Sequence, residues 1–213
     1  MEADTVIFSI YAALRNSDYR RPVVVDAADT DIYVAAAHTS HMYPGDLLIK
    51  RKNAFVNSRQ FLKDSMIECI IPMHCMTGCD ANSGFFGNGK KKTFEKFENS
   101  ESAWRQLMQC GECLEIDEEV IQDLMQFTRH IMYGDNTSQS MAEARTTKWK
   151  SLKAKNFSRL PPDEDSLRQH IKRANFLAYL MRHPSIKNHP SPLGHRWTLN
   201  NRLCRPLRFR HGS

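Results

Sequence analysis

The sequence lacks long apolar runs, a secretory leader and internal repeats, and each absence excludes a class of protein. No apolar run approaches the roughly 20 residues of a membrane-spanning helix, although hydrophobic residues make up 41% of the 213 residues. The chain opens with Met1-Glu2-Ala3-Asp4, which is acidic where a signal peptide would be basic. We therefore expect an intracellular protein with no membrane partner, built around one main core.

Cysteine is also scarce, with 6 residues in all. Without a secretory leader, free thiols or a metal site are expected in preference to disulfides. Cys75-x3-Cys79 and Cys110-x2-Cys113 could form the two halves of a zinc site beside His74. The first pair is loosely spaced and neither has the Gly and aromatic residues of a zinc knuckle, so zinc is a subordinate alternative.

The charge that is present is unevenly distributed. Lys and Arg number 30 against 24 acids, which gives a net charge of +6 and a pI near 9.0. Residues 112 to 123 are acidic, whereas residues 145 to 173 and 196 to 211 are strongly basic. Such asymmetry suits a polyanion partner, although a solvated surface or tail gives the same composition.

Residue periodicity predicts an α/β organisation in the first part of the chain. Apolar residues at helical spacing predict a helix over residues 3 to 16. The β-branched run Val23 to Val25 follows, which is typical of a buried strand in a parallel sheet. Residues 46 to 50 predict a second strand, while residues 32 to 37 fit either a strand or a helix.

The later segments are mainly helical in pattern. Helices are expected over residues 57 to 66, from Lys90 through Phe97, after Ser100, from Asp117 through Ile131 and from Asp163 through Met181. Residues 67 to 76 are apolar but interrupted by Pro72, and the tail after His183 is expected to be irregular. The polar stretch after Gly134 predicts two units, residues 1 to 135 and a basic helical extension over residues 136 to 213.

Five carboxylates from three separated elements could converge on one crevice. They are Glu2 and Asp4 in the first turn of a helix, Asp29 and Asp31 at a strand end, and Asp80 in a Gly-flanked turn. Clustered carboxylates at strand ends and helix starts are what hard divalent cations require. Acids also favour N-caps and turns for structural reasons, so spacing alone leaves both interpretations open.

A Gly-rich turn precedes a run of lysines. Gly87-x-Gly89 opens into Lys90 to Lys92, which offers backbone amides at a helix N-terminus and positive charge for a nucleic-acid phosphate. The Gly84-x4-Gly89-Lys90 spacing imitates a P-loop, but Lys91 stands where Ser or Thr should follow. The alternative is an interhelical turn with solvated lysines.

The order of these motifs resembles that of the flap-endonuclease/XPG-type 5′ nucleases of the PIN-like superfamily. The motifs are Glu2-Ala3-Asp4, Asp29-Thr30-Asp31, Thr77-Gly78-Cys79-Asp80 and Gly87-Asn88-Gly89-Lys90-Lys91. The chain is similar in particular to a divergent, largely uncharacterised PIN-like group of invertebrate and mobile-element-rich genomes. The segments that carry this closer likeness are His74-Cys75-Met76-Thr77-Gly78-Cys79-Asp80 and Phe86-Gly87-Asn88-Gly89-Lys90. The likeness covers roughly residues 2 to 98, and Leu160-Pro161-Pro162 extends it.

The resemblance implies a fold and an activity. The fold is α/β, a PIN-like (Rossmann-like) parallel sheet flanked by helices, with a helix-hairpin-helix-like turn at residues 83 to 98. The activity is hydrolysis of DNA phosphodiesters at flapped or branched structures, which implies a nuclear location. Two divalent cations, Mg²⁺ or Mn²⁺, would be held by Glu2, Asp4, Asp29, Asp31 and Asp80, with Asp29, Asp31 and Asp80 as the catalytic set. The residues that would grip duplex phosphates are Gly87, Gly89, Lys90, Lys91 and Lys92.

The sequence departs from the family pattern in two places. Ala28 stands where the group has an acid, and the family domain begins with a strand and further segment ahead of the position of Glu2. The resemblance therefore implies part of a domain, with an exposed sheet edge or face. Two alternatives stay open: a catalytically inactive nucleic-acid-binding module and a zinc-stabilised interaction protein. Trp104, Trp149 and Trp197 are expected to be packing residues and not base-stacking platforms.

Overall fold

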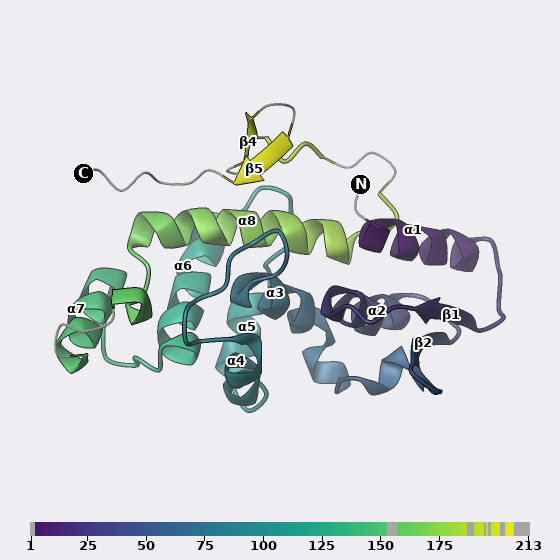
Figure 1. Cartoon of the computed structure of the whole chain (residues 1–213), viewed down its shortest axis with the longest axis horizontal. Coiled ribbons are helices and arrows are strands. Elements are labelled where there is room, and N and C mark those ends of the chain that lie inside the picture. The colour runs from purple at the N-terminus through teal and green to yellow at the C-terminus, as the bar shows by residue number, and fades with distance from the viewer. Residues whose placement is uncertain are drawn as a thin grey trace.

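The structure is a computed structural model that describes residues 3–152, 157–186, 190–193, 195, 197–200 and 203–206. Its helices and strands confirm the predicted α/β class (Figure 1). The α-helices are α1 (Ala3–Asn16), α2 (Thr30–Met42), α3 (Ile67–Thr77), α4 (Lys90–Phe97), α5 (Glu101–Met108), α6 (Glu118–Phe127), α7 (Met141–Ser151) and α8 (Glu164–Arg182). The strands are β1 (Val23–Asp26), β2 (Leu47–Arg51), β3 (Ala54–Asn57), β4 (Trp197–Asn200) and β5 (Leu203–Pro206).

The main sheet is mixed, in contrast to the parallel sheet that the sequence predicts. Strand β1 pairs with β2 in parallel, and β2 pairs with β3 in antiparallel fashion, in the order β1-β2-β3. Arg51 pairs with Ala54, so only Lys52 and Asn53 connect β2 to β3, and Lys52 has a φ of 50°. A two-residue hairpin of this kind needs a left-handed residue, which lysine rarely supplies. The sequence therefore gives no clear sign of this turn or of β3.

The first sheet strand is covered on one face. Val25 is 8% exposed and packs with Phe8 of α1 and Ile32 of α2, whereas Val24 on the other face is 49% exposed. The prediction that this run is a buried strand is therefore wrong for Val24. The helices of this part, α1 and α2, contribute to the core on the side of Val25.

A second and larger core joins α3 to α8. It includes Ile71 of α3, Phe97 of α4, Leu107 of α5, Leu124 of α6 and Ile171 of α8, each fully buried. Helix α8 runs along α3 in Figure 1, and its residue Met181 packs against both cores. The hydrophobic core therefore crosses the predicted boundary at residue 135.

Several local predictions are settled by the structure. Residues 32 to 37 belong to helix α2, and Pro72 lies inside a continuous α3. The predicted helix over residues 57 to 66 is absent: Asn57 ends β3, and two 3₁₀ turns follow, Ser58–Gln60 and Asp64–Met66. The tail contains the β4–β5 hairpin, so the prediction of an irregular tail is wrong there. None of the helices in the described ranges is both long and apolar enough to cross a bilayer.

Candidate active site

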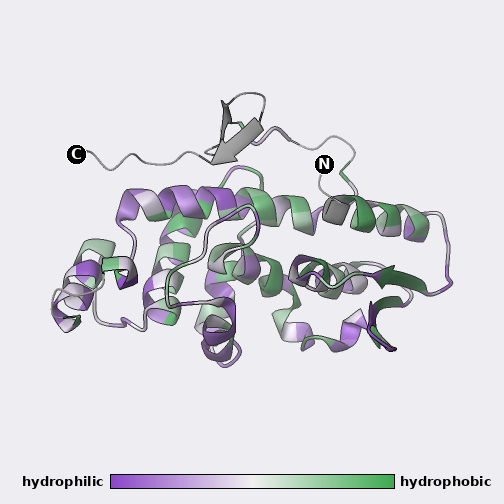
Figure 2. Cartoon of the chain, viewed as in Figure 1, coloured by the Kyte–Doolittle hydropathy of each residue, from purple (hydrophilic) through white to green (hydrophobic). Residues whose placement is uncertain are grey.

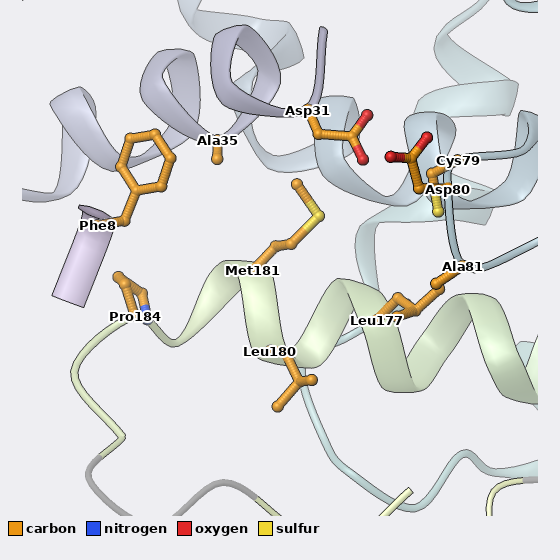
Figure 3. Close-up of a pocket in the computed structure, with 10 residues that line it drawn as sticks. All are labelled: Phe8, Asp31, Ala35, Cys79, Asp80, Ala81, Leu177, Leu180, Met181 and Pro184. Atoms are coloured by element: carbon orange, nitrogen blue, oxygen red, sulfur yellow. The ribbon is translucent and has the colours of Figure 1, made fainter. Parts of the chain in front are cut away.

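One pocket brings together two of the predicted carboxylates. It lies where α1, α2, α8 and the turn after α3 meet, and its volume is about 70 Å³, which is room for a few water molecules. In Figure 3 the carboxylates of Asp31 and Asp80 point toward one another at one end, while apolar side chains occupy the rest. The residues that line the pocket are Phe8, Asp31, Ala35, Cys79, Asp80, Ala81, Leu177, Leu180, Met181 and Pro184.

Asp31 is held in place by a buried histidine. It lies in the first turn of α2, its side chain is 17% exposed, and its Oδ1 is 2.9 Å from Nε2 of His74. The ring nitrogen has no fully aligned hydrogen-bond partner, so the pair is a close polar contact. This contact with His74 lowers the pKa of Asp31, and the charge of Lys90 adds to the effect, while burial opposes it. Asp31 is therefore a carboxylate near neutral pH.

The sequence indicates His74 only as part of the His74 to Asp80 motif and of the zinc alternative. It lies in the last turn of α3 and is 1% exposed. The available signal is a histidine among the apolar residues of the second half of α3, between Met73 and Cys75. Because a buried polar side chain needs a partner, such a residue predicts a polar contact. The sequence does not show that the partner is Asp31, because the two lie on different helices.

The other three predicted ligands are placed differently. Asp29 is exposed and caps α2, since its Oδ1 accepts a hydrogen bond from the backbone N–H of Asp31 at 3.0 Å. Asp29 does not line the pocket. Glu2 lies outside the described residues, and Asp4 belongs to the first turn of α1 with its side chain outside the description. Position 4 is one helical turn before Phe8, which does line the pocket.

Asp80 is carried by a short, firmly anchored turn. The backbones of Cys79 and Asn82 pair with each other at 2.9 and 3.1 Å. The Asn82 side chain is buried, donates to the carbonyl of Cys75 at 3.1 Å, and accepts from Nε of Arg173 at 3.3 Å. Helix α8 thus fixes the turn that presents Asp80. Sequence reasoning missed this anchor because Asn82 and Arg173 lie 91 residues apart.

Cys79 lines the pocket beside the two carboxylates. A hydrogen bond with Cys75 lowers the pKa of Cys79 to about 6, assisted by the backbone of Ala81 and opposed by burial. By contrast, burial raises the pKa of the Cys69 thiol to about 12 and that of Cys110 also to about 12. All four of these cysteines are free thiols.

The helix that anchors the Asp80 turn makes folding stability depend on pH. His170 of α8 donates from Nε2 to the carbonyl of Met76 at 2.8 Å, and burial lowers the pKa of His170 to about 4. The unfolded chain, with a histidine pKa of about 6.5, therefore takes up this proton first as the pH falls. We expect the free energy of unfolding to drop by about 2 kcal/mol between pH 7 and pH 5 from this group.

Urea unfolding at the two pH values measures the effect. A His170→Gln variant is expected to be less stable at pH 7 but to lose about 2 kcal/mol less than the wild type on acidification, since the titrating group is gone. An equal pH dependence in both proteins would contradict the assignment of the effect to His170.

The Gly-Lys turn lies at the start of α4. Gly89 is the N-cap residue of α4 with φ −72° and ψ 168°, and a Cβ added there would meet no atom within 4 Å. Lys91 and Lys92 are exposed, while Lys90 is half-buried and acts electrostatically on Asp31. The predicted phosphate grip is therefore open to solvent and electrostatically linked to the acidic pocket.

Gly87 adopts the left-handed backbone conformation in this turn. It has a φ of 78°, in the left-handed region that favours glycine, and it faces Arg159, whose Nε would be 3.9 Å from an added Cβ. The turn that the sequence predicts as a phosphate grip thus lies next to a cation from a distant part of the chain.

The donors for a metal are few in the described part of the chain. No group of three or more His, Cys, Asp or Glu side chains that could hold a metal ion occurs among the described residues. The zinc arrangement considered for Cys75, Cys79, Cys110, Cys113 and His74 is thus not assembled there. Asp31 and Asp80 are the two predicted ligands that the structure brings together.

Comparison with protein-family models, with curated proteins and with solved structures found no significant match. The functional assignment therefore depends on the residues and their geometry.

Proposed function

We propose that the chain carries the acidic site of a PIN-like, divalent-metal-dependent nuclease that hydrolyses phosphodiester bonds in DNA. The observation that supports this most is the meeting of Asp31 and Asp80 in one pocket although they come from α2 and from the turn after α3. Both are oxygen donors of the type that Mg²⁺ and Mn²⁺ prefer. Lys90, at the open N-terminus of α4, adds a positive charge that acts on Asp31 and would attract a substrate phosphate.

The two described carboxylates fit a hard cation. Mg²⁺ keeps several waters and is commonly bound through one or two carboxylates together with substrate phosphates. Asp31 and Asp80 would hold it, and His74 would orient Asp31 from behind. When bound, such an ion supplies Lewis acidity and a lowered pKa for its water. The chain's own contribution is to position the two carboxylates and to bind the phosphate backbone.

A catalytically inactive nucleic-acid-binding module is the second candidate. It is favoured by the capping role of Asp29, which removes one of the three predicted carboxylates whose side chains the structure describes from the pocket. The two functions are separated by incubating the full chain with a flapped DNA duplex in Mn²⁺. Metal-dependent cleavage identifies the nuclease, whereas metal-independent binding without cleavage under any divalent ion identifies the binding module.

Gly89→Ala tests the phosphate grip separately from the acids. An alanine fits the backbone of Gly89 without any close contact, so stability should change by less than about 0.5 kcal/mol. A phosphate seated on the N-terminus of α4 would meet the added methyl group and lose charge-assisted hydrogen bonds. We expect about tenfold weaker binding of duplex DNA, measured by fluorescence polarisation in EDTA. Unchanged affinity in the folded variant would contradict the grip.

A further inference from the structure

A basic and aromatic surface continues from the Gly-Lys turn onto α7. We call it the α4–α7 surface, and it consists of Lys92 and Lys96 of α4, Lys148 and Trp149 of α7, and Phe157 and Arg159 of the 3₁₀ turn Phe157–Arg159. In Figure 2 α4 is predominantly hydrophilic, in contrast to the apolar residues along α3. All six side chains are exposed or half-buried.

The positive charges of this surface are close enough to affect one another. Partial burial and the charges of Lys92 and Lys148 lower the pKa of Lys96, so lysines of α4 and α7 repel one another across the surface. The last turn of α7 carries Lys148 and Lys150. Because an anion bound here would relieve this repulsion, the arrangement suits a row of phosphates.

The surface is physically joined to the Gly-Lys turn. Arg159 lies beside Gly87. Tyr133 donates a hydrogen bond to the carbonyl of Leu160 at 3.4 Å, and its ring contacts Phe85 edge-on. The segment that carries Arg159 is therefore tied to the residues that precede α4, and Arg159 joins the Gly-Lys turn to the basic residues that follow it along the chain.

Two acidic side chains, Glu143 and Glu95, lie on the helices that carry this surface. Glu143, in the first turn of α7, accepts a hydrogen bond from the backbone N–H of Gln139 at 2.7 Å. Glu95 lies with Lys90 to Lys92 around the start of α4. Lys148 and Lys150 flank Trp149 in α7, and Arg159 follows Phe157 by two residues, so positive charge lies beside the aromatic pair.

An aromatic pair, exposed at Phe157 and half-buried at Trp149, lies beside these charges. The rings of Trp149 and Phe157 are 4.7 Å apart at 36°, and Phe157 is 67% exposed. The sequence predicts Trp149 as a packing residue. It packs against Phe157, which lies on the surface and not in the core. Exposed aromatic rings among lysines and arginines are the elements with which proteins bind unpaired bases and their phosphates.

We propose that the α4–α7 surface binds a single-stranded segment of nucleic acid, with bases stacked on Phe157 and Trp149 and phosphates at Lys92, Lys148 and Arg159. Its place beside the Gly-Lys turn makes it the path of the unpaired strand of a flapped substrate, a consequence that rests on the proposed function. The binding itself needs neither a metal nor cleavage.

The experiment measures binding of fluorescent oligo-dT and oligo-U to the full chain in EDTA. Phe157→Ala is expected to weaken binding by about tenfold, because a stacked base is lost, and Phe157→Tyr is expected to restore it. Lys148→Gln should reduce the slope of log affinity against log salt by about 0.7. Phe55→Ala and Arg20→Gln are the matched controls, since Phe55 is 61% exposed in β3 and Arg20 is exposed beyond α1.

The outcomes separate this inference from the nuclease. The surface is supported if Phe157→Ala binds either oligonucleotide more weakly, binds a blunt duplex as tightly as the wild type does, and both control variants keep the wild-type affinity for the oligonucleotides. This holds whether or not Mn²⁺ cleavage is seen. Equal loss for duplex and single strand, or no change in single-strand binding, would overturn base stacking at Phe157. Absence of cleavage with intact single-strand binding would remove the nuclease and leave this surface in place.

Discussion

Replacing Asp31 by Asn is expected to lower Mn²⁺-dependent cleavage of a flapped DNA duplex by roughly 10²- to 10³-fold, since a bound cation contributes several kcal/mol to such a reaction. Asn keeps the size of the side chain and a polar contact for His74, which lies 2.9 Å from Asp31. It removes the negative charge that a cation would need. Asp80→Asn is expected to act in the same direction, because Asp80 faces the same pocket.

Initial rates of cleavage, measured beside thermal melting of each variant, make this test specific. Asp18→Asn is the matched control, since the Asp18 side chain is 79% exposed and contacts Arg20 beyond the end of α1. Asp18 has a φ of 66°, which Asn tolerates. Wild-type rates in folded Asp31→Asn and Asp80→Asn variants would refute the acidic site, whatever the affinity for DNA.

Elements with their own local signals were predicted well. The apolar spacing of α1 and of α8 predicted both helices, and Ile171 and Ala178 on the apolar face of α8 are fully buried. Ser100 and Asp163 cap their helices through side-chain hydrogen bonds. Helix caps and apolar helix faces depend on residues three or four positions apart, so the sequence alone indicates them.

Elements that depend on tertiary partners were not predictable in the same way. Strand β3 depends on pairing with β2 and on a lysine at φ 50°. The continuation of α3 through Pro72 depends on a core that buries ten residues of that helix. Burial of this kind outweighs local propensity, and nothing near Pro72 in sequence indicates it.

In the candidate site, too, local signals were predictable and tertiary contacts were not. The strand-end motif indicated both Asp29 and Asp31, but the direction of α2 decides which of them faces the pocket. Asp29 is the extended N-cap residue before α2, whereas Asp31 lies in the first turn, so one carboxylate caps the helix and the other turns toward Asp80. The anchoring of the Asp80 turn by Asn82 and Arg173 depends on the position of α8, which no local pattern reveals.

Gly78→Ala is expected to destabilise the fold by about 3 kcal/mol or more. Gly78 ends α3 with φ 105° and ψ 136°, a conformation that an L-residue adopts only with strain. A Cβ there would lie 2.6 Å from both the Cα and the backbone N of Gly84, so the chain itself would have to shift.

For a chain of this length such a loss corresponds to a fall in Tm of roughly 6 to 12 °C. Gly89→Ala is the matched control for Tm alone, because its added Cβ meets nothing within 4 Å and its φ is −72°. Since Gly78 lies two residues before Asp80, the shift would also move that carboxylate relative to Asp31, so cleavage should fall even where the variant remains folded. Equal Tm values for the two alanine variants would show that Gly84 does not lie against Gly78, and the geometry of the Asp80 turn would have to be revised.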